Sequence, residues 1–356
     1  MLNESLSVAA EDISLENVTR CVAEHYGIDG TASMLTSERD RNFRIVANDG
    51  RGYVLKVGNP AEDPLVADFQ TSALLHIEKE APSLPVPRVV HALNGETLLH
   101  LSFDGGTPRP VRMTRFLPGV MMSTVIRTDR LRGRLGALLA HLDDALSSFT
   151  HPAARHELAW DIRNASRMAA LIEHVNGEDR RALARHFLDN FERHAQPFFP
   201  TLRSQVVHND LNLHNVLVHP DSPDTIVGVL DFGDMVDTYL VCDVAVGASY
   251  HLVDEREEPR GPWERVVQFV AAYHAVRPLT GAEIDLLYDL IAARFVITVV
   301  ITGWRAARYP ENSTYILRNN ARSWQGLALL LELPRAQAQA RLHQACPMER
   351  DSCGNH

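Results

Sequence analysis

Two short polar segments in the second half of the chain carry residue types that suit phosphoryl transfer. In the first, residues 206–218, Asp210 and Asn215 lie five positions apart between two apolar runs. Phosphoryl transfer needs a carboxylate that orients the attacking hydroxyl and accepts its proton, with oxygen ligands for magnesium close by. We therefore interpret Asp210 as the base and Asn215 as a metal ligand.

The second segment is an apolar run, residues 226–230, that leads directly into Asp231. A strand over this run would place the Asp231 carboxylate at its end, and Gly233 permits the turn that follows. A carboxylate there can bridge magnesium to nucleotide phosphates. Asp231 follows Asn215 by sixteen residues, a spacing that suits a hairpin carrying both metal ligands.

A third candidate is Lys56, within the strand-like run 53–57. Alternation along a strand places Val54 and Lys56 on one face and the more apolar neighbours on the other. A lysine in this setting is either a solvated edge residue or a ligand of phosphate. Each of the three patterns is common by chance, but their order along one chain favours a kinase.

The elements that must position these residues change character near residue 117. Before it, the pattern predicts a helix over 15–26, a second over 63–77, and strands over 43–46, 53–57, 88–91, 97–101 and 111–116, with Asn48-Asp49-Gly50 as a hairpin turn. After it, helices are predicted over 130–148, 160–173, 179–195, 263–276, 281–306 and 319–331, with short strands over 215–219 and 225–231. We therefore predict an α+β, two-lobed fold, with a β-rich lobe at 1–116 and a mainly helical lobe at 117–356.

Composition limits the partners. The chain has 356 residues, with 35 basic against 45 acidic side chains, and a net acidic chain is a poor sequence-independent binder of nucleic acid. The most apolar stretch, 284–304, is interrupted by three charged residues, which disfavours a membrane span. The start has no basic region followed by an apolar core, so we expect no signal peptide and a cytoplasmic protein.

The chain resembles the branch of the protein-kinase-like fold that contains aminoglycoside phosphotransferases and choline kinases. More narrowly, it resembles hydroxylysine kinases and the kinase modules fused to class III aminotransferases. The resemblance extends from about residue 35 to about residue 345 and is carried by segments 37–43, 53–57, 84–89, 160–163, 208–215 and 230–235.

The resemblance implies a role for each matched position. Asp210 is then the catalytic aspartate, Asn215 and Asp231 hold Mg²⁺, and Lys56 contacts the phosphates of ATP or GTP. Asp243 matches an aspartate that braces the catalytic loop. Further nucleotide-binding positions are Ser37 and Asn42, in the segment that replaces a glycine-rich loop; Thr114 and Phe116, in the hinge at 113–117; and Gln70, where a glutamate usually pairs with the lysine.

The acceptor is predicted less closely. The acidic charge and the position of Asp234, Asp237 and Tyr239 just after Asp231 suggest a cationic acceptor held by these three residues. The resemblance favours an amino alcohol or a hydroxylated amino acid similar to hydroxylysine. Antibiotic O-phosphotransfer and an inactive binding module on the same fold remain alternatives. In the simpler interpretation, Asp234 only caps a turn and Asp237 faces solvent. Trp160 and Asp161 are expected to pack in the core in preference to lying at the cleft.

Overall fold

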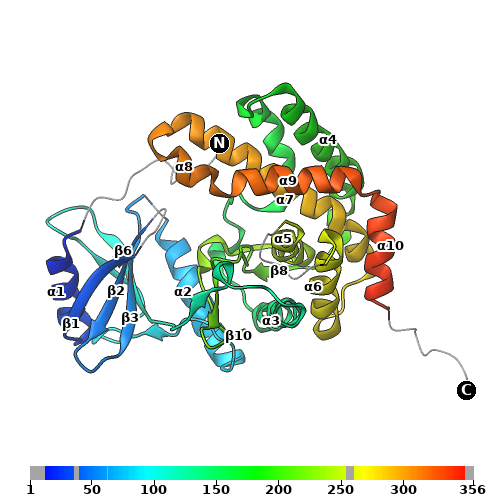
Figure 1. Cartoon of the computed structure of the whole chain (residues 1–356). Helices are drawn as coiled ribbons and strands as arrows, with labels where there is room; N and C mark the ends of the chain where they lie inside the picture. Colours follow the sequence, from blue (N-terminus) through cyan, green and yellow to red (C-terminus); the bar gives the residue numbers. More distant parts are fainter. Residues whose placement is uncertain (1–12, 36–39, 62, 254–259, 349–356) are drawn as a thin grey trace, which may run out of the picture.

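The computed structural model describes residues 13–35, 40–61, 63–253 and 260–348 and shows two lobes (Figure 1). The N-terminal lobe contains an antiparallel sheet in the order β1-β2-β3-β6-β4, with β5 also paired to β6. These strands are β1 Gly30–Leu35, β2 Arg41–Ala47, β3 Gly52–Val57, β4 Val89–Val90, β5 Leu99–Leu101 and β6 Arg109–Arg115. Helix α1, Leu15–Tyr26, begins at the Ser14 cap and ends at Gly27, whose φ of 65° suits glycine.

The predicted hairpin and its alternation are confirmed. Strands β2 and β3 pair antiparallel, with Phe43 opposite Leu55 and Asn42 opposite Lys56. Phe43 and Leu55 are fully buried in the core of this lobe together with Val111 and Met113. Lys56 and Asn42 therefore share the other face of the sheet. The strand β1 was not predicted.

Helix α2, Pro64–Glu80, starts at the Asp63 cap and links the lobes. Its buried face, including Phe69 and Ile77, belongs to the core of the C-terminal lobe and not to that of the sheet. The Phe69 ring stacks on Phe149, with centroids 5.9 Å apart. The helix thus fixes the sheet relative to the helical lobe, and it lies between them in Figure 1.

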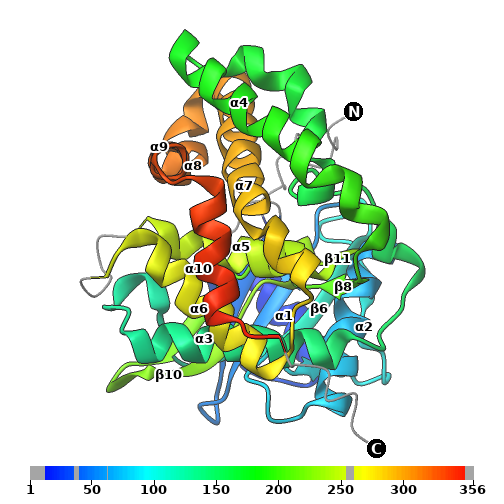
Figure 2. The same ribbon diagram turned by 90° about the vertical axis from the view of Figure 1, so that its right-hand side faces the viewer.

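The C-terminal lobe is mainly helical, as predicted, and Figure 2 shows it from the side. Its α-helices are α3 Asp129–Leu146, α4 Glu178–His194, α5 Leu240–Leu252, α6 Pro262–Val276, α7 Gly281–Arg308, α8 Ser313–Ile316, α9 Asn320–Glu332 and α10 Arg335–Ala345. The segment predicted as a helix over 160–173 is a 3₁₀ helix, η4, Ile162–His174. Helices α5 and α10 were not predicted.

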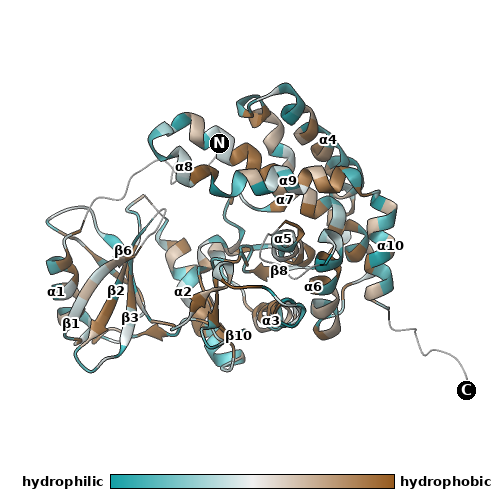
Figure 3. Cartoon of the chain, in the orientation of Figure 1, coloured by the Kyte–Doolittle hydropathy of each residue, from teal (hydrophilic) through white to brown (hydrophobic). Residues whose placement is uncertain are grey.

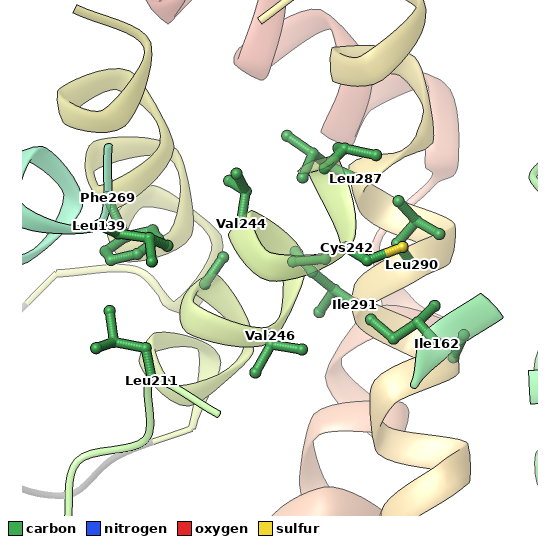
Figure 4. Close-up of a cluster of buried hydrophobic side chains, with 14 of the residues drawn as sticks. Leu139, Ile162, Leu211, Cys242, Val244, Val246, Phe269, Leu287, Leu290 and Ile291 are labelled. Atoms are coloured by element: carbon green, nitrogen blue, oxygen red, sulfur yellow. The ribbon is translucent and has the colours of Figure 1, made fainter. Parts of the chain in front are cut away.

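Helix α5 passes through the centre of this lobe. Cys242, Val244 and Val246 are all fully buried and pack with Leu287 and Ile291 of α7 (Figure 4). All residues of α5 except Tyr250 are buried, so protein surrounds this helix on nearly every side. Helix α5 is therefore a rigid support for the loops that contact its first turn.

Two small sheets carry the loops of interest. One has the order β10-β9-β7 and the other pairs β11 with β8; the strands are β7 Val120–Met121, β8 Ser204–Val207, β9 Val216–His219, β10 Ser222–Val229 and β11 Val236–Tyr239. Since β7 pairs with β9, the chain enters the C-terminal lobe soon after Arg115, the end of β6. The boundary at residue 117 stays a prediction with which this arrangement agrees.

Apolar residues line the inner faces of the strands and helices in both lobes, and polar residues cover the outer faces (Figure 3). Among the residues that the structure describes, no helix combines the length and the apolar character needed to cross a bilayer.

Candidate active site

The loop between β8 and β9 carries Asp210 and is held in place by hydrogen bonds to Asp243 in the first turn of α5. The Asp243 carboxylate accepts hydrogen bonds from the backbone N–H groups of Asn209 (2.8 Å) and His208 (3.3 Å). Asn209 has a φ of 61°, an uncommon value for a residue with a side chain. This bracing agrees with the role predicted for Asp243.

The Asp210 carboxylate is held by amide donors from its own loop. Asn212 and Asn215 each donate a side-chain N–H to Asp210 Oδ2, both at 2.8 Å. On the other oxygen, Arg294 Nη2 lies 3.4 Å from Oδ1. The side chain of Asp210 is 17% exposed, so it is oriented by protein groups while it stays accessible to a small molecule.

The charges around Asp210 oppose one another. Burial raises the pKa of Asp210 well above its ordinary value, and the negative charges of Asp234 and Asp231 raise it further, whereas Arg294 lowers it. A cation bound near Asp210 would offset the repulsion from these negative charges. This arrangement fits a site that gains a metal ion together with its nucleotide.

Asn215 and Asp231 lie at the open end of one hairpin, as the sequence predicts. Val216 of β9 pairs with Val229 of β10, and the Leu230 N–H donates to the carbonyl of Asn215 at 2.7 Å. Asp231 is exposed with a φ of 58°, and its Oδ1 accepts the Gly233 N–H at 3.1 Å. The two segments that carry the metal-ligand candidates therefore meet.

These two residues suit magnesium. The amide nitrogen of Asn215 is used by Asp210, which leaves the amide oxygen for a metal, and Asp231 supplies a carboxylate. No group of three or more His, Cys, Asp or Glu side chains in the described ranges could hold a metal. Magnesium is commonly held by one or two protein oxygens plus phosphates and water, so the pair is sufficient, and its role as ligands stays a prediction.

His208 connects the two loops. Its Nε2 lies 3.1 Å from the carbonyl oxygen of Leu230, and its Nδ1 lies 3.3 Å from the backbone nitrogen of Asp210. Its ring also meets Phe232 edge-on, with centroids 4.8 Å apart. The buried ring of His208 therefore joins the loop that carries Asp210 to the segment that carries Asp231.

The partner of Lys56 is Asp40, which the sequence analysis did not identify. Lys56 Nζ lies 2.7 Å from Asp40 Oδ2, and both side chains are largely buried. Burial raises the pKa of Asp40. The charge and hydrogen bond of Lys56, the charge of Arg112 and the backbone N–H of Asn59 together outweigh burial, so the pKa of Asp40 lies below its ordinary value. Asp40 sits at the start of β2, beside the segment expected to replace the glycine-rich loop.

Gln70 occupies the position expected for the lysine's partner but contacts other groups. Its side-chain oxygen accepts a hydrogen bond from Arg112, and its nitrogen lies 3.5 Å from the carbonyl of Gly233. Gln70 thus bridges helix α2, strand β6 and the segment after Asp231. The contact of Gln70 with nucleotide stays a prediction.

The other nucleotide candidates fall into three groups. In the sheet, Asn42 lies opposite Lys56, and Thr114 lies opposite Val54 on the same face. In the hinge, the N–H of Phe116 is already donated to the carbonyl of Gly52 at 3.0 Å, so a base would use other backbone groups. Ser37 lies outside the described residues.

The acceptor candidates are placed differently from one another. Asp234 is close enough to Asp210 to raise its pKa. Asp237 pairs with Arg155 Nε at 2.9 Å, and the Tyr239 ring packs on Phe199 with centroids 4.5 Å apart. Asp234 is the best placed of the three to meet an acceptor beside Asp210.

Arg294 of α7 is the residue near Asp210 that the sequence analysis did not select. It is only 5% exposed; Nη1 donates to the carbonyl of Trp160 at 2.8 Å, and the guanidinium lies 5.6 Å from the centre of that ring. Trp160 is half-buried and Asp161 fully buried against Thr238. The available signal was that Arg294 is one of three charged residues in the most apolar stretch of the chain, 284–304.

Comparison with a family model gives a match over residues 35–279 to the phosphotransferase enzyme family. The chain is 28% identical to hydroxylysine kinase of Danio rerio over 353 residues, which covers 95% of this chain and 97% of that protein. It is also 28% identical to homoserine kinase of Methylobacillus flagellatus over 268 residues, with 74% of each chain covered.

Solved structures show the same fold. A microcompartment-associated aminopropanol kinase superimposes with a TM-score of 0.68 at 20% identity, covering 93% of this chain and 98% of that one. An amicoumacin kinase, solved with AMP-PNP, Ca²⁺ and its antibiotic, also gives a TM-score of 0.68, at 14% identity, covering 90% and 94%. At this identity the likeness concerns the fold.

Proposed function

Because the chain belongs to the phosphotransferase enzyme family and is a small-molecule kinase that acts on hydroxyl groups, we propose that its acceptor is an amino alcohol or a hydroxylated amino acid similar to hydroxylysine. The donor is ATP or GTP with Mg²⁺. The two relatives named above as hydroxylysine kinase and homoserine kinase act, by their names, on hydroxylated amino acids. The site beside Asp210 is suited to such a molecule.

The observation that supports this function best is the setting of Asp210. Two amide donors at 2.8 Å fix one carboxylate oxygen, so the other can accept a proton from an acceptor hydroxyl. A hydroxyl held by that oxygen would be oriented for in-line attack on the terminal phosphorus. The carboxylate then holds the proton while the new phosphate ester forms and the bond to the leaving nucleotide breaks.

The remaining groups position the donor. Lys56, oriented by Asp40, would contact the nucleotide phosphates from the sheet side, and Asn215 and Asp231 would hold Mg²⁺ from the hairpin side. When bound, the metal neutralises the charge that develops on the phosphoryl oxygens. Asn215 also orients Asp210, so one side chain links the base to the metal position.

Turnover with purified protein tests the proposal. The protein would be incubated with Mg²⁺ and either ATP or GTP, together with hydroxylated amines, hydroxylated amino acids or aminoglycosides. The expected result is a phosphate ester on the hydroxyl of an amino alcohol or amino acid, detected by phosphorus NMR and by nucleotide consumption. A preference for aminoglycosides would favour an antibiotic O-phosphotransferase, and no turnover with any acceptor would favour a binding module.

Two further expectations belong to the proposal. The acidic charge of the chain supports partners that are small molecules and disfavours nucleic acid. A cytoplasmic location agrees with the supply of ATP or GTP that such a reaction uses.

A further inference from the structure

The guanidinium of Arg294 joins the base candidate to a second, distant segment of the C-terminal lobe. Its Nη2 lies 3.4 Å from Asp210 Oδ1, and its Nη1 donates to the backbone carbonyl of Trp160 at 2.8 Å. Arg294 itself belongs to α7, 84 positions after Asp210 in the chain. The two terminal nitrogens of one rigid, planar group therefore reach from a backbone carbonyl to the carboxylate.

Both supports of this guanidinium are held by the packed interior of the lobe. Helix α7 is buried along most of its length and packs against η4. The carbonyl of Trp160 directly precedes Asp161, whose fully buried carboxylate accepts hydrogen bonds from Thr238 Oγ1 and from the backbone N–H of Arg163, both at 2.9 Å. The position of the Arg294 guanidinium is therefore set from two sides before it meets the catalytic loop.

Stability alone does not account for an arginine at this position. Arg294 is only 5% exposed, and its neighbours Ala293 and Phe295 are buried apolar residues. Taking a guanidinium out of water is costly, and an apolar side chain of similar volume is often at least as stabilising in a protein interior. A buried charge that contacts the carboxylate of a base candidate is therefore expected to serve the reaction.

Resting on the proposed function, we propose that Arg294 is a positioning residue, which holds Asp210 Oδ1 where the acceptor hydroxyl meets it while Asn212 and Asn215 hold Oδ2. Donors on both oxygens restrict rotation of the carboxylate. An ionised carboxylate has about four acceptor sites, so Oδ1 can accept from Arg294 and from the hydroxyl together. The hydroxyl is thereby fixed relative to the terminal phosphorus, and a displacement of about 1 Å at a reacting group can cost about a hundredfold in rate.

Arg294→Lys tests whether the planar guanidinium is needed or only its charge. Lysine keeps the charge but lacks the fork that reaches both the Trp160 carbonyl and Asp210. With hydroxylysine, or another acceptor that the unmodified enzyme phosphorylates, kcat should fall about tenfold to a hundredfold, while nucleotide affinity measured by calorimetry stays within about threefold. Expressing kcat per nucleotide-binding site counted in the same titration prevents a loss of folded protein from imitating this effect.

Arg308→Lys is the matched control. Arg308 is an exposed residue of the same helix, and its guanidinium also lies over a tryptophan ring, that of Trp304, at 6.0 Å from the ring centre. This control should keep kcat within about twofold of the unmodified enzyme. A kcat within about threefold for Arg294→Lys as well would overturn the positioning role and leave the kinase proposal intact; absence of turnover by the unmodified enzyme with every acceptor would overturn both.

A double-mutant cycle separates positioning from general support of the lobe. In an Asp210→Asn background the carboxylate that Arg294 positions is gone, so adding Arg294→Lys should lower the residual kcat by less than about twofold. A residue that only supports the fold would lower kcat by the same factor in both backgrounds, since its effect does not pass through Asp210. Equal factors in the two backgrounds would therefore overturn the proposal.

Discussion

Lys56 Nζ is paired with Asp40 Oδ2 at 2.7 Å, across the start of the sheet and not across to helix α2. The position on α2 where a partner was expected holds Gln70, which is engaged by Arg112 of the neighbouring strand. The lysine is therefore oriented by its own sheet, close to the segment expected to cover the phosphates. The position of α2 is therefore less important for the orientation of the lysine.

Asp40→Asn should weaken nucleotide binding. Without the carboxylate, a largely buried ammonium loses its counter-charge, which costs about 1–3 kcal/mol because the lysine is still partly in solvent. We expect a lower Tm and a rise of about tenfold in the KM for nucleotide, measured by thermal unfolding and steady-state kinetics. Gln70→Ala is the matched control and should affect the nucleotide KM less; the reverse ranking would show that α2 supplies the functional partner.

Asp210→Asn should remove the base while keeping the loop folded, because an amide can still be braced by its neighbours. General-base catalysis contributes about 10²–10⁴-fold, and we expect kcat to fall by a factor in that range. Nucleotide affinity, measured by calorimetry, should stay within about threefold. A variant that turns over at a near-normal rate would exclude Asp210 as the base.

The two metal-ligand candidates should differ in their response to magnesium. Asp231→Ala removes a charged oxygen and should abolish activity at any practical magnesium concentration. Asn215→Ala removes a neutral oxygen and an amide that orients Asp210, so it should both raise the magnesium requirement and lower kcat at saturation. Titrations of activity against magnesium would measure both effects. An unchanged magnesium requirement in the Asn215 variant would remove it from the metal site.

Much of the fold could be predicted because most elements carry a local signal. The helix Leu15–Tyr26 has a cap at each end, and strands β2 and β3 alternate around a clear turn. Helix α5 was missed because it is buried on all sides and so has no amphipathic period to detect. Strand β7 was missed because it has only two residues and exists through its pairing with β9.

In the candidate site, too, the residues with a local sequence signal were predicted and those without one were missed. Asp210 and Asn215 were selected from their spacing in one loop, and Asn215 and Asp231 from the spacing of one hairpin. Both spacings are local properties, and the hairpin is confirmed. Arg294 was missed because its contact joins segments far apart in the chain: it reaches Asp210 across 84 residues. Asp40 lies only sixteen residues before Lys56 and was missed because the partner of the lysine was expected on helix α2. A single sequence gives the residue types at such positions but not which side chains the tertiary packing brings together.

A buried pair of aspartates beneath the catalytic loop predicts how stability depends on pH. Asp143 of α3 is fully buried next to Asp243; burial raises the pKa of Asp143 well above its ordinary value, and the charge of Asp243 raises it further. The Tyr273 hydroxyl donates to Asp143 at 2.7 Å. The folded protein therefore keeps a proton on this pair that the unfolded chain releases above about pH 4.

The sign follows from that difference. A carboxyl whose pKa is raised on folding contributes no penalty below the unfolded value near pH 4, and the free energy of unfolding then falls as the pH rises toward the folded pKa. Asp143→Asn replaces the protonated carboxyl with a neutral amide of similar shape, so it should remove this part of the fall. Relative to the unmodified protein, the variant should gain about 1.4 kcal/mol for each pKa unit of the shift that lies below the pH of measurement.

Chemical denaturation at several pH values between 4 and 9 would measure the effect. The neighbouring substitution Asp144→Asn is the control, because Asp144 is half-exposed and paired with Arg277 at 2.8 Å; it should not flatten the profile. Parallel profiles for the unmodified protein and Asp143→Asn would mean that the pair is ionised in the folded state. In that case Asp143 and Asp243 would be two adjacent buried negative charges. The backbone N–H groups of His208 and Asn209, which donate to Asp243, do not compensate two such charges on their own.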